Sequence, residues 1–261
     1  MIQRKTVRIL GVKIDCLTRR MALETLEELI ASRAKHQVCV TNVWTTVLMQ
    51  KDQKLKSINN SASLVVADGM PLAWVSKWFG PSIPMRIAGW DLFHGFHAIA
   101  VEKGYRVFFL GSSPDTLEAI RKNLNRTYPA LRVAGMYAPP FTPEFSLDEN
   151  RRMVAAVNDA RPDLLWVGMS APKQERWIFE HLDQLGVPVA IGVGAVFDFA
   201  AGKLKRAPRW MQRAGIEWLH RLLLEPSRLW KRYIIGNSLF VWHIMRHLLA
   251  TWLRSKKNAD G

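Results

Sequence analysis

One carboxylate in this 261-residue chain stands where a parallel sheet would present it to a ligand. Asp68 directly follows the apolar run 64–67, and Gly69 and Pro71 come after it. A carboxylate held at the end of a buried strand can act as a general base or bind the hydroxyl groups of a substrate. An aspartate just before a helix is also a common N-cap, and the spacing alone favours that interpretation.

Glycines mark two further places where a phosphate or nucleotide could approach the backbone. Gly111 opens a Gly-Ser-Ser-Pro turn before an expected helix, whose free backbone N–H groups would bind an anion. Gly194 belongs to the sequence Gly-Val-Gly-Ala-Val-Phe-Asp, which begins at Gly192. A tight turn capped by Ser113, and close packing of a strand on a helix, explain the same glycines without a ligand.

Charged and amide side chains accompany other expected strand ends. Arg86 could hold a diphosphate and Asp91 could cap the helix that follows, although a salt bridge between the two is the simpler alternative. Gln174 and Glu175 fall in the first turn of an expected helix, where polar side chains face the rim of the sheet.

Apolar strand-like runs alternate with helix-period segments through the first two hundred residues. The expected strands are residues 6–10, 12–17, 37–41, 64–67, 105–110, 131–136, 163–168 and 187–193, the first two forming a hairpin. The expected helices are residues 18–34, 71–79, 115–125, 147–160 and 172–185. This alternation predicts an α/β fold with a mostly parallel, Rossmann-like sheet flanked by helices. Ligands bind such sheets beyond the carboxyl ends of the strands, where Thr41 and Asn42 also lie.

The positive charge is concentrated at the end of the chain. The formal net charge is +15, and residues 201–261 carry +10 of it together with five of the eleven tryptophans. This shift in composition predicts a boundary near Ala200, between an α/β body of residues 1–200 and a basic helical appendage of residues 201–261. We expect helices in the appendage at residues 210–225, from residue 226 and at residues 237–253.

The last of these helices predicts contact with a membrane surface. His243, Arg246 and His247 interrupt its apolar run, so it is not expected to span a bilayer. A basic amphipathic helix with tryptophans suits the surface of an anionic membrane. Packing on the body or on another subunit, which leaves a homo-oligomer open, is the structural alternative. Nucleic acid is not expected as a partner, because no known binding module is present.

Several kinds of site are excluded by missing motifs. The chain lacks the full glycine fingerprints of dinucleotide and P-loop sites, the G-x-S-x-G nucleophile elbow and CxxC pairs. The histidine pairs with helical spacing have no accompanying acid pattern, so neither a metal nor another cofactor is expected. With two cysteines and no apolar leader in the first eight residues, a cytosolic location is the expectation.

A series of motifs runs in order through nearly the whole chain. It comprises Thr41-Asn42, Ala67-Asp68-Gly69-Met70-Pro71, Arg86-Ile-Ala-Gly89-Trp-Asp91-Leu, Phe109-Leu110-Gly111, Gly168-Met-Ser-Ala-Pro172-Lys-Gln174-Glu175, Gly192-Val-Gly194-Ala-Val-Phe197-Asp198, Gly202, Arg206-Ala-Pro208, Glu217-Trp218, Arg221-Leu and Glu225-Pro226. Each motif is weak by itself, whereas the ordered set is specific. The chain thereby resembles the WecG/TagA/CpsF family of bacterial glycosyltransferases (glycosyltransferase family 26).

The resemblance implies an inverting, metal-independent glycosyltransferase that needs no cofactor and whose body, residues 1–200, binds a UDP-sugar. The sugar, of N-acetylmannosamine, uronic acid or hexose type, would move to a polyprenyl-diphosphate-linked saccharide during teichoic acid or cell-surface polysaccharide synthesis. The implied location is peripheral, at the cytoplasmic face of the bacterial cell membrane. The alternative is a Rossmann-type nucleotide-binding oxidoreductase or methyltransferase, which would need the glycine fingerprint that is missing.

The resemblance also implies roles for individual residues. Asp68 would be the general base that deprotonates the acceptor hydroxyl, and Asn42 and Gln174 would lie around the donor. Val40 stands where the family often has a threonine, so the role of that threonine does not carry over to Thr41. The other expected substrate-binding residues are Thr41, Gly69, Arg86, Asp91, Gly111, Glu175 and Gly194. The basic residues expected at the diphosphate of the lipid acceptor are Arg206, Arg221, Arg228, Lys231 and Arg232.

Overall fold

The computed structural model describes residues 4–259, apart from the side chains of Arg213, Arg254, Ser255 and residues 257–259. Residues 1–3, part of the segment in which no leader is expected, lie outside the described residues. The strands are β1 (Thr6–Ile9), β2 (Val12–Asp15), β3 (His36–Thr41), β4 (Leu64–Ala67), β5 (Arg106–Gly111), β6 (Arg132–Tyr137), β7 (Leu164–Gly168) and β8 (Val189–Gly192).

The helices of the body are α1 (Arg19–Ala31), α2 (Val43–Lys51), α3 (Gln53–Ser61), α4 (Met70–Ser76), α5 (Gly89–Lys103), α6 (Pro114–Thr127), α7 (Leu147–Ala160), α8 (Lys173–His181) and α9 (Val196–Ala200). The C-terminal segment, residues 201–259, contains α10 (Arg209–Arg213), α11 (Glu217–Leu224), α12 (Pro226–Trp230), the π-helical turn η1 (Lys231–Ile235) and α13 (Gly236–Ala259).

Six strands form one parallel sheet in the order β4-β3-β8-β7-β5-β6. The strands β1 and β2 form a separate antiparallel hairpin, as predicted. The hairpin packs beside β4, where the Val65 N–H donates to the Asp15 carboxylate at 2.8 Å. The structure therefore confirms the predicted α/β fold with a parallel sheet flanked by helices.

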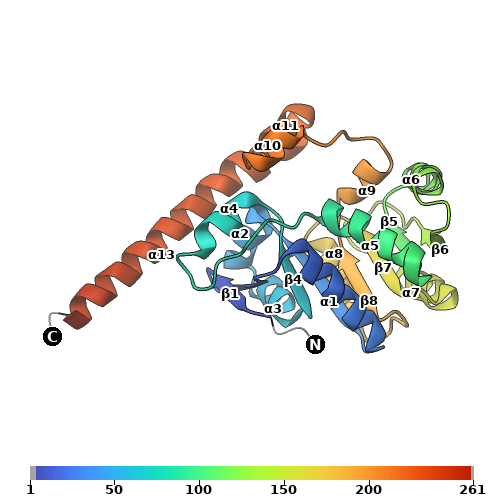
Figure 1. Cartoon of the computed structure of the whole chain (residues 1–261), viewed down its shortest axis with the longest axis horizontal. Coiled ribbons are helices and arrows are strands. Elements are labelled where there is room, and N and C mark those ends of the chain that lie inside the picture. The colour runs from blue at the N-terminus through green and yellow to red at the C-terminus, as the bar shows by residue number, and fades with distance from the viewer. Residues whose placement is uncertain (1–3, 260–261) are drawn as a thin grey trace.

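Helices cover both faces of the sheet (Figure 1). On β7, the fully buried Trp166 packs in the core cluster that contains residues of α1, α5 and α6, whereas its neighbours Leu165 and Val167 pack in the cluster with α7 and α8. Because successive strand residues point to opposite faces, a sheet covered on both sides needs uninterrupted apolar strands. This is why the apolar runs locate the strands so well.

The body helices α2, α3 and α9 lie outside the predicted helix ranges, and α5 is predicted only as the helix that follows Asp91. The helix α2 is packed both against the body and against α13, so it has buried residues on several faces and no clear apolar stripe. Its start is nevertheless set locally, because Asn42 Oδ1 accepts from the Thr45 N–H at 3.1 Å as an N-cap. Asp52 caps α3 in the same way, accepting from the Leu55 N–H at 2.9 Å.

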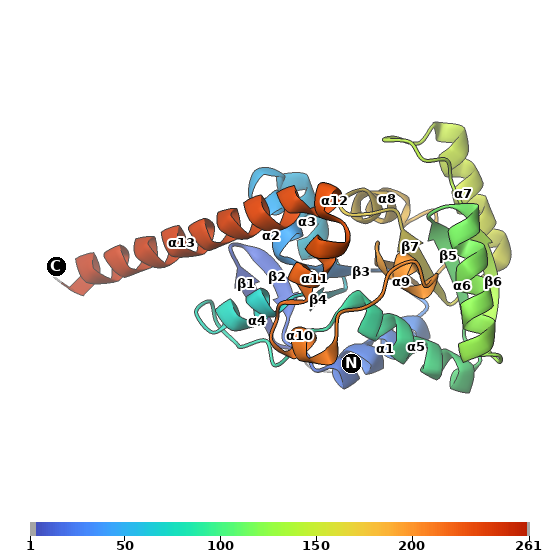
Figure 2. The same cartoon turned by 90° about the horizontal axis from the view of Figure 1, so that it is seen from above.

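The C-terminal helices differ from the predicted ones in their bounds. The helix predicted at 210–225 is divided into α10 and α11 at Gly215, whose φ of +73° is unfavourable for residues with a side chain. The segments α12, η1 and α13 follow one another with helical backbone, and α13 continues past the predicted end to Ala259 (Figure 2).

The beginning of α13 is part of the protein core. Phe240 and Ile244 are 3% and 5% exposed and pack in one cluster with the hairpin, α2 and α4. The predicted domain boundary near Ala200 stays a prediction. Within the described part of the chain, every helix is too short or too polar to cross a membrane.

Candidate active site

Four neighbouring strands bring the predicted site residues to one edge of the sheet. Asp68 follows β4, Asn42 follows β3, Gly194 follows β8, and Gln174 lies in the first turn of α8 after β7. The carboxyl ends of parallel strands meet at the same edge, which is where ligands bind in open α/β sheets. We call this edge, with the part of the C-terminal segment that lies against it, the carboxyl-edge site.

Asp68 continues the sheet by one residue and leaves its carboxylate free. Its N–H donates to the Thr41 carbonyl at 2.7 Å, whereas the carboxylate makes no hydrogen bond or ion pair with another described residue. Gly69, with φ of +137°, precedes α4, and this helix has no side-chain cap. The N-cap interpretation of Asp68 is therefore wrong, and its carboxylate is available to a ligand.

The surroundings of Asp68 make it a stronger proton acceptor than an ordinary aspartate. Burial raises the pKa of its carboxyl group, which the guanidinium of Arg86 lowers and the carboxylate of Glu217 raises. The guanidiniums of Arg232 and Arg221 lower the same pKa. The net pKa is raised, so the carboxylate combines increased basicity with nearby positive charge.

A chain of ion pairs fastens the C-terminal segment to the carboxyl edge. Glu217 of α11 pairs with Arg86 Nη1 and, at 3.3 Å, with Arg206 Nε. Arg206 Nη1 lies 3.1 Å from one Asp91 oxygen, and Arg19 Nη2 lies 3.5 Å from the other. The suggested salt bridge between Arg86 and Asp91 is wrong, because Glu217 takes Arg86 and Arg206 takes Asp91. Arg86 and Arg206, which were both expected to bind a diphosphate, are thus both paired with the Glu217 carboxylate.

The remaining basic residues of the C-terminal segment have different surroundings. Arg221 Nε and Nη2 and Arg232 Nε are buried without a hydrogen-bond partner, and burial lowers the pKa of Arg232. Arg221 Nη2 is 3.6 Å from Glu225, to which Arg228 Nη2 donates at 2.9 Å. Lys231 is exposed. Buried guanidinium N–H groups without partners are costly, so Arg221 and Arg232 indicate a place for an anionic ligand.

Gln174 and Glu175 form a buried polar pair at the same edge, 4% and 5% exposed. Gln174 Nε2 donates to Glu175 Oε1 at 2.8 Å, while Gln174 Oε1 and Glu175 Oε2 have no partner. Burial raises the pKa of the Glu175 carboxyl group. A Cβ atom on Gly192 would lie 2.9 Å from the Gln174 side chain, so the glycine makes room for the amide. The pair can therefore offer the amide oxygen to a ligand donor.

Thr41 and Asn42 already have partners inside the protein. Thr41 is buried and its hydroxyl donates to Asn59 Oδ1 at 2.5 Å, so its side chain packs against α3 and not into the site. The Asn42 oxygen caps α2, which positions the side chain at the end of β3.

Three further predicted residues have structural roles. Gly111 approaches β7 so closely that a Cβ atom would lie 2.6 Å from the Gly168 carbonyl oxygen. Ser113 caps α6 by accepting from the Thr116 N–H at 3.3 Å. This is the capped turn that was predicted as the alternative to a phosphate site. Asp91 caps α5 from within its first turn, accepting from the Ala88 N–H at 3.2 Å.

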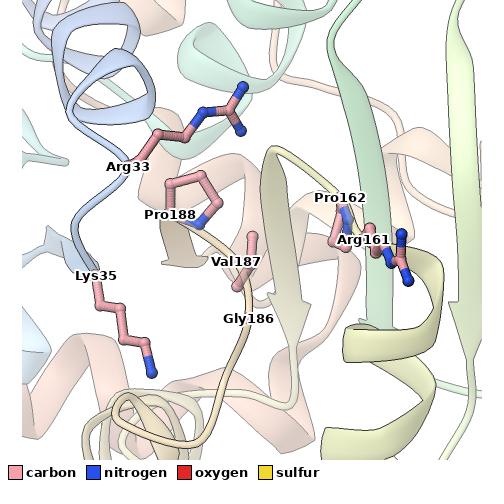
Figure 3. Close-up of a pocket in the computed structure, with 7 residues that line it drawn as sticks. All are labelled: Arg33, Lys35, Arg161, Pro162, Gly186, Val187 and Pro188. Atoms are coloured by element: carbon pink, nitrogen blue, oxygen red, sulfur yellow. The ribbon is translucent and has the colours of Figure 1, made fainter.

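A cavity of about 280 Å³ lies at the opposite, amino end of the strands (Figure 3). Its lining consists of Arg33, Lys35, Arg161, Pro162, Gly186, Val187 and Pro188. Arg33 and Arg161 stand at the C-terminal ends of α1 and α7, where the helix dipole favours cations, and Arg33 pairs with Asp163 at 2.9 Å. The cations around this cavity thus have a structural explanation.

The histidine pairs with helical spacing are His94/His97 and His243/His247, and members of both pairs pack against aromatic rings. His97 is fully buried, accepts from Trp166 Nε1 at 3.1 Å, and has a pKa lowered by burial to about 3. His247 stacks on the ring of Phe79. Within residues 4–259, no three His, Cys, Asp or Glu side chains that the structure describes are close enough to hold a metal ion.

Sequence reasoning missed two acids near the site. Glu217 is one of three acids in residues 201–261, and an acid in so basic a segment is itself a signal. Asp198 ends the glycine-rich motif that contains Gly194; burial raises its pKa and the guanidinium of Arg228 lowers it. Asp198 belongs to the body and Glu217 to the C-terminal segment, and the surroundings of both depend on how that segment folds back onto the body.

A parallel sheet that gathers a free carboxylate, arginines and an amide at its carboxyl edge defines a Rossmann-like α/β ligand-binding protein. Residues 7–254 match the sequence profile of the family described as Glycosyl transferase WecG/TagA/CpsF family. The chain belongs to this family. The resemblance is thereby confirmed, and the family is not one of oxidoreductases or methyltransferases.

Several relatives share one name, N-acetylglucosaminyldiphosphoundecaprenol N-acetyl-beta-D-mannosaminyltransferase. The protein from Bacillus subtilis (strain 168) is 31% identical over 185 residues, which cover 70% of this chain and 69% of the relative. The protein from Staphylococcus aureus (strain NCTC 8325 / PS 47) is 30% identical over 229 residues, which cover 87% and 86%. The Bacillus spizizenii protein is 29% identical over 197 residues, with 76% and 74% covered.

Proposed function

We propose that this protein is an inverting glycosyltransferase that moves a sugar from a UDP-sugar to a polyprenyl-diphosphate-linked saccharide. The observation that carries the proposal is the Asp68 carboxylate, unpaired, of raised pKa, and placed at the carboxyl end of β4 beside arginines. The names of the relatives supply the class of acceptor, a diphosphoundecaprenol-linked sugar, and suggest N-acetylmannosamine as the transferred sugar.

The proposed reaction is a single displacement. The acceptor hydroxyl oxygen attacks the anomeric carbon while Asp68 takes the hydroxyl proton, and the bond from that carbon to the UDP oxygen breaks. UDP leaves with the bonding electron pair, and attack opposite to it inverts the anomeric configuration. No metal is needed in this scheme, because guanidiniums neutralise the diphosphates. Arg221 and Arg232 have buried N–H groups without a hydrogen-bond partner, which suits them to the acceptor diphosphate.

The donor would lie across the ends of β3, β7 and β8. Asn42 is held there because its side chain caps α2, and Gln174 because its amide donates to Glu175. Gln174 Oε1 is free to accept a hydrogen bond from an N–H or hydroxyl group of the sugar or the base. The location that fits a lipid-linked acceptor is peripheral, on the cytoplasmic face of the membrane. The basic C-terminal segment would make that contact through its charge and exposed apolar residues.

Transfer assays test the proposal directly. The full chain is incubated with UDP-N-acetylmannosamine, its uronic acid, UDP-glucose or UDP-glucuronic acid, and a short-chain polyprenyl-diphosphate N-acetylglucosamine acceptor. We expect transfer from one donor, insensitive to chelator, with an inverted anomeric centre in the product. Asp68→Asn is expected to lose transfer, whereas Asp159→Asn, an exposed aspartate of α7, keeps it. No transfer from any donor, or full activity of Asp68→Asn, would sink the proposal.

A further inference from the structure

Exposed large hydrophobic side chains are concentrated in two segments of the chain. Of nineteen that are exposed among the described residues, sixteen lie in residues 70–85 or 210–253. The other three are Phe141, Leu147 and Phe179. Contiguous exposed apolar surface on a soluble protein marks an interaction site. The first of the two segments belongs to the body and contains α4 and the turn after it, which carry the exposed Trp74 and Trp78. The proposed function does not use these two tryptophans.

The helix α4 lies beside the C-terminal helices. A Cβ atom on Gly215, between α10 and α11, would lie 2.8 Å from the Trp74 ring. The ring of Phe79, just after α4, stacks on His247 of α13 with centroids 4.8 Å apart. Figures 1 and 2 both show α4 next to α10, whereas α13 slopes away from the body toward its C-terminal end. The rings of Trp74 and Trp78 are 51% and 53% accessible, so the segment that touches these helices through Trp74 and Phe79 also presents exposed tryptophans.

The same pairing of a cation with an exposed tryptophan occurs in both segments. Four such pairs have the cation 5.3 to 5.7 Å from the ring centroid: Lys77–Trp78, Lys231–Trp230, Arg246–Trp242 and Lys256–Trp252. Tryptophan is favoured at the boundary between water and lipid, and the cation beside it can reach the headgroups. Residues 69–85 contain no acid, so this part of the body suits an anionic surface as the C-terminal segment does.

We propose that α4 is a second membrane contact, made by the α/β body itself, and that Trp74 and Trp78 enter the interface of an anionic lipid bilayer together with the C-terminal helices. The proposal rests on the peripheral membrane binding in the proposed function and adds a body element to it. Asp68 lies two residues before α4. The contact would therefore hold the carboxyl-edge site at the level of the lipid headgroups, where the diphosphate of a lipid-linked acceptor lies.

Vesicle binding by the full chain tests this contact. The double variant Trp74→Ser/Trp78→Ser is sedimented with phosphatidylglycerol/phosphatidylethanolamine vesicles, without donor or acceptor. We expect its apparent affinity to fall about tenfold or more, since each tryptophan removes a large apolar side chain from the interface. The matched control Phe141→Ser/Phe179→Ser removes two exposed aromatic rings elsewhere and is expected to bind as the wild type does.

A charge reversal keeps the test independent of folding. Lys77 is exposed, so Lys77→Glu is expected to weaken binding to anionic vesicles. The midpoint of thermal unfolding of this variant is expected to equal that of the wild type. Binding of both α4 variants at wild-type affinity would overturn the proposal. So would a wild-type dimer, without vesicles, that Trp74→Ser/Trp78→Ser converts to a monomer, because α4 would then face a second copy. A wild type that binds vesicles but transfers no sugar would contradict the proposed function and leave this result standing.

Discussion

The α/β body and the C-terminal segment differ in how far they bury their apolar residues. The body buries them between a sheet and two helix layers, and residues 1–200 carry only +5 of the net charge. Residues 201–261 carry +10, and the C-terminal segment leaves Trp242, Met245 and Trp252 more than half exposed. The two regions use the same apolar residue types. The difference teaches that apolar residues next to dense positive charge are left exposed in this chain, as the proposed membrane contact requires.

Two of the contacts between the two regions differ in character. One is polar, where Glu217 pairs with Arg86 and Arg206 beside Asp68. The other is apolar, where Phe240 and Ile244 pack with the hairpin and α2. The first turns of α13 thus behave like body, and only its later turns extend beyond the body (Figure 1).

The largest expected effect concerns the chemistry of the body. Asp68→Asn should lower transfer by about 10² to 10⁴-fold, the usual contribution of a general base. Because the pKa of Asp68 is raised in the folded protein, its ionised form destabilises the fold at neutral pH, and removing it should not lower the unfolding midpoint. Transfer assays and thermal unfolding at pH 7 check both expectations. A variant within tenfold of wild-type activity would exclude Asp68 as the base.

The division within α13 can be tested by stability. Phe240→Ala, in the core part, should lower the free energy of unfolding by about 3–5 kcal/mol. Trp242→Ala, two residues away and 51% exposed, should change it by about 0.5 kcal/mol or less. Urea unfolding of the full chain measures both. Equal losses would mean that α13 is not divided into a core part and an exposed part.

The charge contrast predicts a difference in vesicle binding. Neutralising Lys231, Arg246 and Lys256 to glutamine should weaken binding to anionic vesicles by about 3 kcal/mol, roughly a hundredfold. Neutralising Arg20, Lys122 and Arg151, three exposed cations of the body, should have little effect. Sedimentation at low salt measures the difference, which added salt should reduce. Equal losses would show that only net charge matters.

The smallest expected effect lies at the junction of the two regions. The Glu217 carboxylate raises the pKa of Asp68, so Glu217→Gln should lower that pKa. Asp68 must be ionised to act as a base, and activity is lost as the pH falls through its pKa. The acid limb of the pH–rate profile should therefore move to lower pH, and the weakened ion pairs should cost about 1–2 kcal/mol of stability. The control is Glu118→Gln, an exposed ion-paired acid of α6. An acid limb at the same pH in Glu217→Gln as in the wild type would show that Glu217 does not raise the pKa of Asp68.

Features set by local sequence were predicted correctly, whereas features set by contacts between distant residues were not. The strands were located because burial on both faces requires continuous apolar runs, as in Leu164–Gly168. The helix α2 was missed because α13, distant in sequence, packs against it. The partner of Arg86 was missed for the same reason, since Glu217 is 131 residues away. The undivided helix at 210–225 was wrong because the positive φ of Gly215 ends it.

The sequence by itself determined the parallel α/β fold, the family, and the position of Asp68 at a strand end, since these follow from local patterns and ordered motifs. Only the tertiary structure decided that Asp68 is not an N-cap, that Glu217 holds Arg86 and Arg206, and that Trp74 adjoins Gly215 between α10 and α11. The physical reason is that burial and charge pairing depend on which distant segments meet. A local pattern places a side chain on an element, and the packing of the elements sets its pKa, its partners and its exposure.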